Sequence, residues 1–441
     1  MQFGRHIGKG LWAFADKALP AVFALGFIVL VVRVLPQNEY GAWVDIQTIF
    51  MFTSTLGFAL ALQPLTKFAA ETEENGPYIA ASMVISALFI IGASILLLVF
   101  KGVLVRLLDP RGEAPSLSQL FSYLPLLFIT SYYRAFSLSL LQATYQVRKI
   151  FWIDALYFIG VLLLLGGARL MHRLSSAEDV IILNIIAQSA STVLALILTR
   201  RPMSVKLRLR REAFSKMWGF GKFNFWGSTM YAAFSQMDVL FVSSFSGVVA
   251  LATYGAAKQF TRLNDMLSQV IQMFLMPFSS KAQAENDIEK MTVVAEKTIC
   301  FSLLAFTPVF LALFLAPQEI LHLLYKGKYD GGADILRLMS FLSLIVPWNA
   351  VVASYLTGTG KVKAGLISNI FLSGVGLTSY LILTPKYGAI GTTAGFVFTM
   401  LVITVGLVKY LQRFLPLRVS GVFRRTRDAW LFVRRALPGK S

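Results

Sequence analysis

Basic side chains occur inside several of the most apolar stretches of this sequence. Lys258 and Arg262 stand four residues apart, which would place both cations on one face of a helix. Arg134 lies deep in another apolar stretch, and Lys17 lies in the first one. A charge at the bilayer centre costs at least about 2.5–3.5 kcal/mol, so such residues usually face a wet cavity or a partner. Guanidinium and ammonium groups bind phosphate well, and we expect these four cations to line a cationic cavity.

Aspartates accompany the cations. Asp16 precedes Lys17, Asp265 follows Arg262 by three residues, and Asp238 lies in the preceding apolar stretch. A carboxyl group in a low dielectric can load and release a proton, so we expect Asp16, Asp238 and Asp265 to be coupling candidates. Salt bridges to the neighbouring cations are the alternative. Beyond a coupling proton or sodium ion, the sequence predicts no cofactor.

The composition identifies the solvent around these charges. The chain has 441 residues, of which 56% are apolar and only 14% are charged. Soluble domains carry about 25% charged residues, so an aqueous enzyme, a disordered chain and a disulfide scaffold are all disfavoured. One cysteine permits no internal disulfide, and three scattered histidines form no zinc motif. We therefore expect an all-α integral membrane protein that is not an enzyme.

About twelve stretches are long and apolar enough to cross a bilayer, for which about 20 residues are needed. No loop between them is large enough for a globular domain. The first stretch is charged and lacks a clear cleavage site, so we interpret it as a span rather than a signal peptide. The predicted spans are 11–35, 41–66, 78–100, 117–141, 150–168, 180–199, 217–245, 249–278, 292–316, 331–357, 364–384 and 388–410.

The distribution of Lys and Arg predicts the orientation. Most basic residues fall on the side that holds both termini, and this side should be cytoplasmic. The rule also accounts for the net charge of +19 without nucleic-acid binding. In the tail, 419–437 has an apolar face with arginines beside it, which predicts a helix that binds anionic membrane lipids. A frayed basic tail is the alternative.

An internal repeat divides the chain. Tyr40-Gly41-Ala42 recurs as Tyr254-Gly255-Ala256, and Lys67 recurs as Lys281, both at an offset of 214. We expect two six-helix bundles related by a pseudo-two-fold axis along the membrane normal, a layout of secondary transporters with the site between the halves. A duplication kept only for stability is the alternative. The predicted parts are a first bundle at 1–199, a basic cytoplasmic linker at 200–216, a second bundle at 217–411 and a basic amphipathic cytoplasmic tail at 412–441.

Polar residues recur at equivalent positions of the repeat. At each pair, polar character persists while charge is held mostly in one copy, as expected for a polar seam between two halves. A loose alignment of polar positions would produce the same pattern. The pairs are Asp45 with Gln259, Asp154 with Asn369, and Arg134 with Asn349.

The opening helices and the end of the fourth span resemble a known family. The segment from Gly26 contains Val32-Arg33-Val34-Leu35, Glu39-Tyr40-Gly41 and the ending Lys67-Phe68-Ala69-Ala70-Glu71, and a Gln142-Ala143 to Arg148 stretch occurs later. These motifs are similar to those of the Wzx-type polysaccharide and O-antigen flippases. That family is the polysaccharide branch of the multidrug/oligosaccharidyl-lipid/polysaccharide exporter superfamily.

The resemblance implies a secondary transporter of the bacterial inner membrane that works by alternating access. Its substrate would be an undecaprenyl-pyrophosphate-linked oligosaccharide, flipped to the outer leaflet for surface polysaccharide synthesis. A polysaccharide polymerase and glycosyltransferases would be partners. A drug or cation exporter of the same superfamily is an alternative, as is a membrane-embedded polymerase or ligase. The exporter should have an acidic cavity, and the enzyme should carry a large catalytic loop.

Overall fold

The computed structural model describes residues 12, 15–16, 19–20, 22–71, 75–144, 146–203, 209–426 and 428. Across these residues the regular structure is entirely helical, without a β-strand. The chain divides into two compact units, which are described separately. The first comprises Met1–Thr253 and Leu324–Lys328, and the second comprises Tyr254–Leu323 and Tyr329–Ser441.

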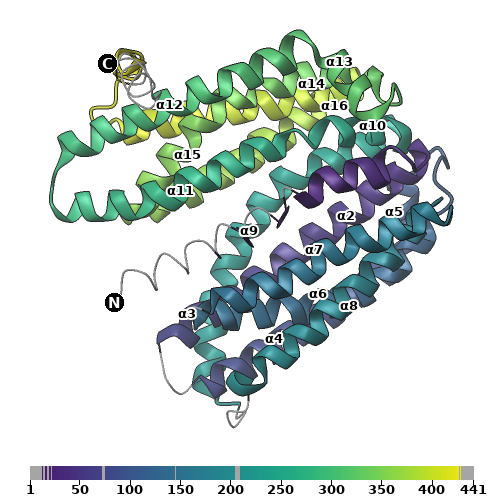
Figure 1. Ribbon diagram of the computed structural model, residues 1–441. Helices are drawn as coiled ribbons and strands as arrows, with labels where there is room; N and C mark the ends of the chain where they lie inside the picture. The colour runs from purple at the N-terminus through teal and green to yellow at the C-terminus, as the bar shows by residue number, and fades with distance from the viewer. Residues whose placement is uncertain are drawn as a thin grey trace, which may run out of the picture. The chain divides into compact units, whose positions relative to one another are not determined.

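The first unit contains long helices that run side by side, with α6 packed against both α8 and α2 (Figure 1). Two π-helical turns, η1 and η2, interrupt the first two long apolar segments. The elements are η1 Ile28–Val32, α2 Gln37–Gly57, η2 Phe58–Leu62, α3 Gln63–Glu71, α4 Gly76–Val99, α5 Lys101–Leu108, α6 Leu117–Ala143, α7 Val147–Leu170, α8 Ala177–Met203, α9 Arg211–Ser246 and the start of α10.

The second unit is built around α15, which packs against α11, α12 and α16. Apolar side chains from these helices form a shared core around Ile299, Val351 and Tyr355. Helix α10 spans Val248–Lys258 in all, and its end belongs to the second unit. The elements that follow it are α11 Thr261–Ala284, α12 Ile288–Leu315, α13 Pro317–Tyr325, η3 Asp330–Gly332, α14 Ala333–Ser340, α15 Leu342–Gly358, α16 Val362–Leu411 and α17 Val419–Arg424.

The helices agree with the predicted all-α membrane class. In the described part of the chain, eight helical segments have the length and apolar composition needed to cross a membrane. They coincide with the predicted spans from 41–66 to 180–199 and from 292–316 onward. The segment Ile367–Leu411 covers the last two of these predicted spans. The region of 11–35 is described in part and contributes a shorter apolar helix, Val22–Val32.

α16 is a helical hairpin rather than one rod. Gly388 has φ 56° and ψ −141°, a left-handed conformation that glycine adopts without steric cost, and it reverses the chain. Beyond it, a Cβ at Gly391 would lie 2.2 Å from the Leu383 carbonyl oxygen, so only glycine permits this approach. Thr384 and Thr392 are joined by a hydrogen bond of 2.9 Å between their hydroxyls. These contacts place the two arms directly against each other.

Helix α9 belongs by its contacts to the first unit, although the repeat assigns its residues to the second half. It packs on α2, η2 and α4. The approach to η2 requires Gly221, because a Cβ there would lie 2.1 Å from the Leu60 carbonyl oxygen. The compact units therefore divide inside α10, at Thr253, rather than at the basic linker. The repeat itself stays a prediction.

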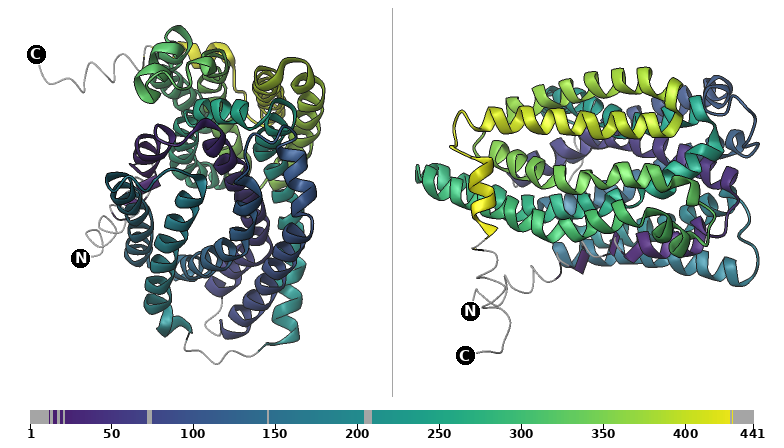
Figure 2. Two further views of the ribbon diagram at one scale, coloured as in Figure 1. Left: turned by 90° about the vertical axis from the view of Figure 1, so that its right-hand side faces the viewer. Right: turned by 90° about the horizontal axis from the view of Figure 1, so that it is seen from above.

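The tail continues from α16 into the short helix α17, which lies crosswise to α16 in Figure 2. Val422 is buried in the core of the second unit, whereas Phe423 is exposed. The Arg425 guanidinium forms an ion pair of 3.1 Å with the buried Glu296 of α12. Within the core of the second unit, α17 thus buries one residue of the predicted apolar face, and 429–437 lies outside the described residues.

Candidate functional site

Arg134 is held in a polar cluster inside the first unit. Its guanidinium forms an ion pair with Asp154 of α7 and donates a 3.2 Å hydrogen bond to the Ser191 hydroxyl of α8. The Tyr157 ring lies 4.4 Å from the guanidinium carbon, in cation–π geometry. Both charged side chains are about 15% exposed. The structure therefore joins two residues that the sequence predicted separately, Arg134 for the cavity and Asp154 for the seam.

Helix α8 supplies the polar wall of this cluster. Ser191 donates a 2.7 Å hydrogen bond to the Ile153 carbonyl, and Asn184 accepts one of 3.1 Å from the Tyr157 hydroxyl. Asn184, Gln188 and Ser191 are all buried. The sequence analysis missed these residues. Their spacing of four and three residues in an apolar span marks one helical face and could have revealed them.

Lys258 and Arg262 flank a break between two helices. α10 ends at Lys258, and α11 begins at Thr261 after the turn at Gln259 and Phe260. The predicted single span at 249–278 is therefore two helices, and the continuous-helix spacing assumed for these cations does not hold. Lys258 lies 5.9 Å from the Tyr254 ring centroid, and Arg262 is exposed. Asp265 follows Arg262 by three residues on α11, and its side chain is also exposed.

The aspartate candidates fall in different surroundings. Asp16 and Asp238 are buried in the first unit, and Asp265 is exposed in the second. Lys17 lies outside the described residues. Asp265 thus lies in the same unit as Lys258 and Arg262, whereas Asp16 and Asp238 lie in the first unit.

The remaining seam candidates are polar contacts within one unit or half-buried positions. Asp45 is fully buried and accepts a 2.6 Å hydrogen bond from the Ser243 hydroxyl of α9. The Asn349 amide donates a 3.2 Å hydrogen bond to the Thr404 hydroxyl, which links α15 to α16. Gln259 and Asn369 are half-buried. Their alignment as one seam stays a prediction.

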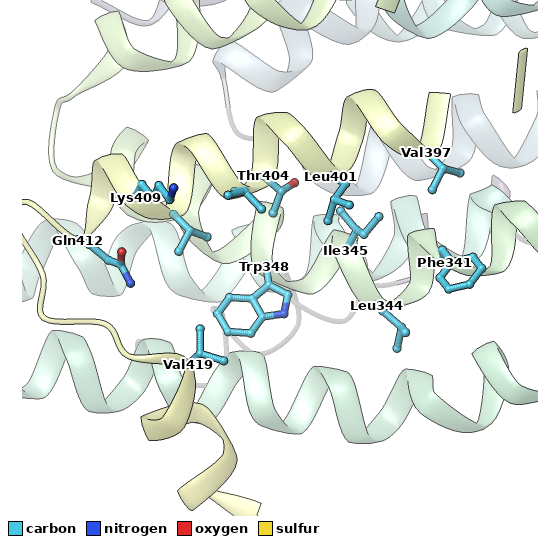
Figure 3. Close-up of a pocket in the computed structure, with 12 residues that line it drawn as sticks. Phe341, Leu344, Ile345, Trp348, Val397, Leu401, Thr404, Lys409, Gln412 and Val419 are labelled. Atoms are coloured by element: carbon cyan, nitrogen blue, oxygen red, sulfur yellow. The ribbon is translucent and has the colours of Figure 1, made fainter. Parts of the chain in front are cut away.

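The second unit also contains an elongated apolar cavity of about 520 Å³ beside α15 and the second arm of α16 (Figure 3). Leu344, Trp348 and Leu401 represent its largely apolar lining, and Lys409 and Gln412 lie together at one end. No sequence motif predicted this cavity. In the described residues, no cluster of three His, Cys, Asp or Glu side chains is arranged for a metal ion.

The fold is that of the transporters of the MOP superfamily. An inward-facing multidrug-resistance MATE transporter of this superfamily superposes over 92% of this chain and 96% of its own, with a TM-score of 0.72 and 14% identity. The lipid II flippase MurJ, in an inward closed conformation, superposes over 99% of this chain and 94% of its own, with a TM-score of 0.77 and 13% identity. At these identities the superpositions establish the fold alone.

Sequence similarity is more local. The MatE family model matches residues 226–380, from α9 into the first arm of α16. An uncharacterized membrane protein, MJ1068 of Methanocaldococcus jannaschii, is 21% identical over 48% of this chain and 42% of its own length. The lipopolysaccharide biosynthesis protein WzxC of Escherichia coli is 22% identical over 40% of this chain and 34% of its own length. The matched stretches thus span less than half of these relatives. The two superposed proteins are a transporter and a flippase, not enzymes.

Proposed function

We propose that this protein flips an undecaprenyl-pyrophosphate-linked oligosaccharide from the cytoplasmic to the outer leaflet of a bacterial inner membrane. The observation that carries the proposal is the pair of cations at the α10–α11 break. Lys258 ends α10, and Arg262 lies in the first turn of α11 with its side chain exposed. Guanidinium and ammonium groups suit the oxygens of a pyrophosphate.

Arg134 has a different place in this proposal. Its charge is already balanced by Asp154, so it contributes less to the attraction of an anion than Lys258 and Arg262 do. We propose that Lys17, Lys258 and Arg262 bind the pyrophosphate and that Arg134 keeps the first bundle in register. Asp265 is the coupling candidate that the neighbouring cations favour, because pyrophosphate and a carboxylate would compete for them. Asp16 and Asp238 remain candidates for proton or sodium coupling.

The similarity to MurJ and WzxC supports a lipid-linked substrate, because MurJ is a lipid II flippase and WzxC is a lipopolysaccharide biosynthesis protein. The cytoplasmic orientation of both termini and partnership with a polymerase and glycosyltransferases belong to the same proposal. The MatE match favours a second candidate, a drug exporter that would use an ion gradient.

The test reconstitutes the full chain in proteoliposomes that contain the glycolipid in the inner leaflet. A lectin added outside reports the arrival of glycan in the outer leaflet. We expect flipping above that of protein-free vesicles, and we expect Arg262→Gln to reduce it at least about tenfold, the equivalent of about 1.4 kcal/mol. Lys281→Gln, at the exposed end of the same helix, is the matched control and should leave the rate unchanged.

The same vesicles separate the two candidates. A cationic dye and the glycolipid are offered in parallel, with and without a proton or sodium gradient. Movement of the dye with no movement of glycan would reject the flippase in favour of the exporter. Equal flipping by native protein and Arg262→Gln would reject the cationic site while leaving flippase activity intact.

A further inference from the structure

The cavity of the second unit is a half-open groove that runs along a helix. Its lining on α16 and the residue after it extends from Val397 to Gln412, which are fifteen residues apart, or about 22 Å along the helix. Most of this stretch lies inside the candidate membrane span Ile367–Leu411, so the cavity runs along the helix through the apolar layer. Its volume of about 520 Å³ is within the range of about 300–1,000 Å³ that is typical of ligand pockets.

The ammonium and carboxamide groups of the cavity lie at one end, and the Thr404 hydroxyl lies midway along it (Figure 3). Lys409 and Gln412 supply the groups at the polar end, whereas Phe341 and Val397 close the opposite end (Figure 3). Lys409 is exposed, so a ligand headgroup can reach its ammonium group. Arg413 and Arg418 are also exposed just beyond this end of α16. A ligand that matches this pattern is an apolar chain with a negative charge at its end.

The docked tail completes the wall beside the charged end. Val419, the first residue of α17, lines the cavity near Trp348. The helix is fixed there by the Arg425–Glu296 ion pair and by Gly421, where a Cβ would lie 1.9 Å from a Glu296 carboxylate oxygen. The mouth therefore consists of α16 on one side and the ion-paired α17 on the other.

We propose that this cavity holds one acyl chain of an anionic phospholipid, with the phosphodiester at Lys409. One lysine within the lining matches a singly charged phosphodiester better than a pyrophosphate, for which several cations would be expected. The exposed arginines near the mouth, Arg413 and Arg418, add attraction to an anionic membrane surface. The lipid would serve as a structural component of the second unit, so this inference does not depend on the transported substrate.

The test uses the full chain reconstituted in vesicles of equal phosphatidylglycerol and phosphatidylcholine, then extracted in mild detergent for native mass spectrometry. We expect native protein to retain phosphatidylglycerol several-fold over phosphatidylcholine. Leu401→Trp, which fills the cavity, should abolish retention of the lipid. Lys409→Gln should remove the headgroup preference, whereas Lys386→Gln, exposed on the same hairpin before Gly388, is the matched control and should keep it.

A spectroscopic measurement covers the case in which Leu401→Trp folds poorly. Brominated phosphatidylglycerol should quench native fluorescence more than that of Trp348→Phe, and the milder Val405→Phe should reduce this difference. Unchanged retention in Leu401→Trp, or no difference due to Trp348, would overturn the proposal. Equal retention of both phospholipids by native protein would overturn it too.

Discussion

Two clusters hold basic side chains within apolar segments, and the surroundings of these cations differ between the two units. In the first unit, Arg134 forms an ion pair with Asp154 and donates a hydrogen bond to Ser191 of α8. In the second unit, Lys258 and Arg262 lie at a helix break, and Arg262 is exposed. An enclosed ion pair stabilises a fold, whereas an exposed cation at a helix break can be reached by a ligand. Substitutions in each cluster test whether the two differ in this way.

The largest expected effect is on the closed cluster. Arg134→Gln leaves Asp154 buried without its cation, which typically costs about 3–5 kcal/mol. We expect a fall of several degrees in the apparent Tm in detergent. The double variant Arg134→Gln/Asp154→Asn should recover most of the loss, because no buried charge remains unpaired. If the double variant is no more stable than the single one, the ion pair is not the source of the effect.

The close packing of α9 against η2, within the same unit, should have the next largest effect on stability. Gly221→Ala places a methyl group 2.1 Å from the Leu60 carbonyl oxygen, so α9 must move away from η2. Such overpacking costs about 1–3 kcal/mol. Gly219→Ala on the same helix meets no atom within 4 Å and is the matched control. A melting temperature lowered equally by both substitutions would contradict the role of the close approach.

The tail contact of the second unit should have a local effect. Arg425→Ala leaves the buried Glu296 carboxylate without a charge-assisted hydrogen bond, which is worth about 1.5–3 kcal/mol. We expect faster hydrogen–deuterium exchange in α17, with unchanged exchange in the core of α15. Thr426→Ala, next to Arg425 but exposed, is the control. Unchanged exchange in α17 would show that Val422 alone holds the helix.

Substitution of Arg262 should have the smallest effect on stability and the largest effect on substrate binding. Arg262→Gln changes an exposed side chain, and exposed substitutions usually alter stability by no more than about 0.5 kcal/mol. Its apparent Tm should match that of the native protein within error while glycolipid flipping falls. A loss of stability comparable to that of Arg134→Gln would instead make this cluster a second structural ion pair.

The sequence predicted the helices more successfully than the contacts between side chains. Long apolar runs specify spans because backbone polar groups must be satisfied inside the helix. The break at Gln259 was missed because no Pro or Gly marks it. Periodicity describes residues on one helix, so it could not pair Arg134 with Asp154, which lie on α6 and α7. The apolar cavity depends on packing around Trp348 and was equally beyond reach of the sequence.

The hairpin at Gly388 has a consequence for the insertion of the protein into the membrane. Gly391 and Gly395 form a small-xxx-small pattern, and both lie in tight contact with the preceding arm, at Leu383 and Ser379. The two apolar arms are joined by a single reversing residue, so no polar loop separates them. The two arms should therefore leave the translocon together as one preassembled unit. A bulky residue at Gly391 would then impair membrane insertion of the hairpin rather than transport.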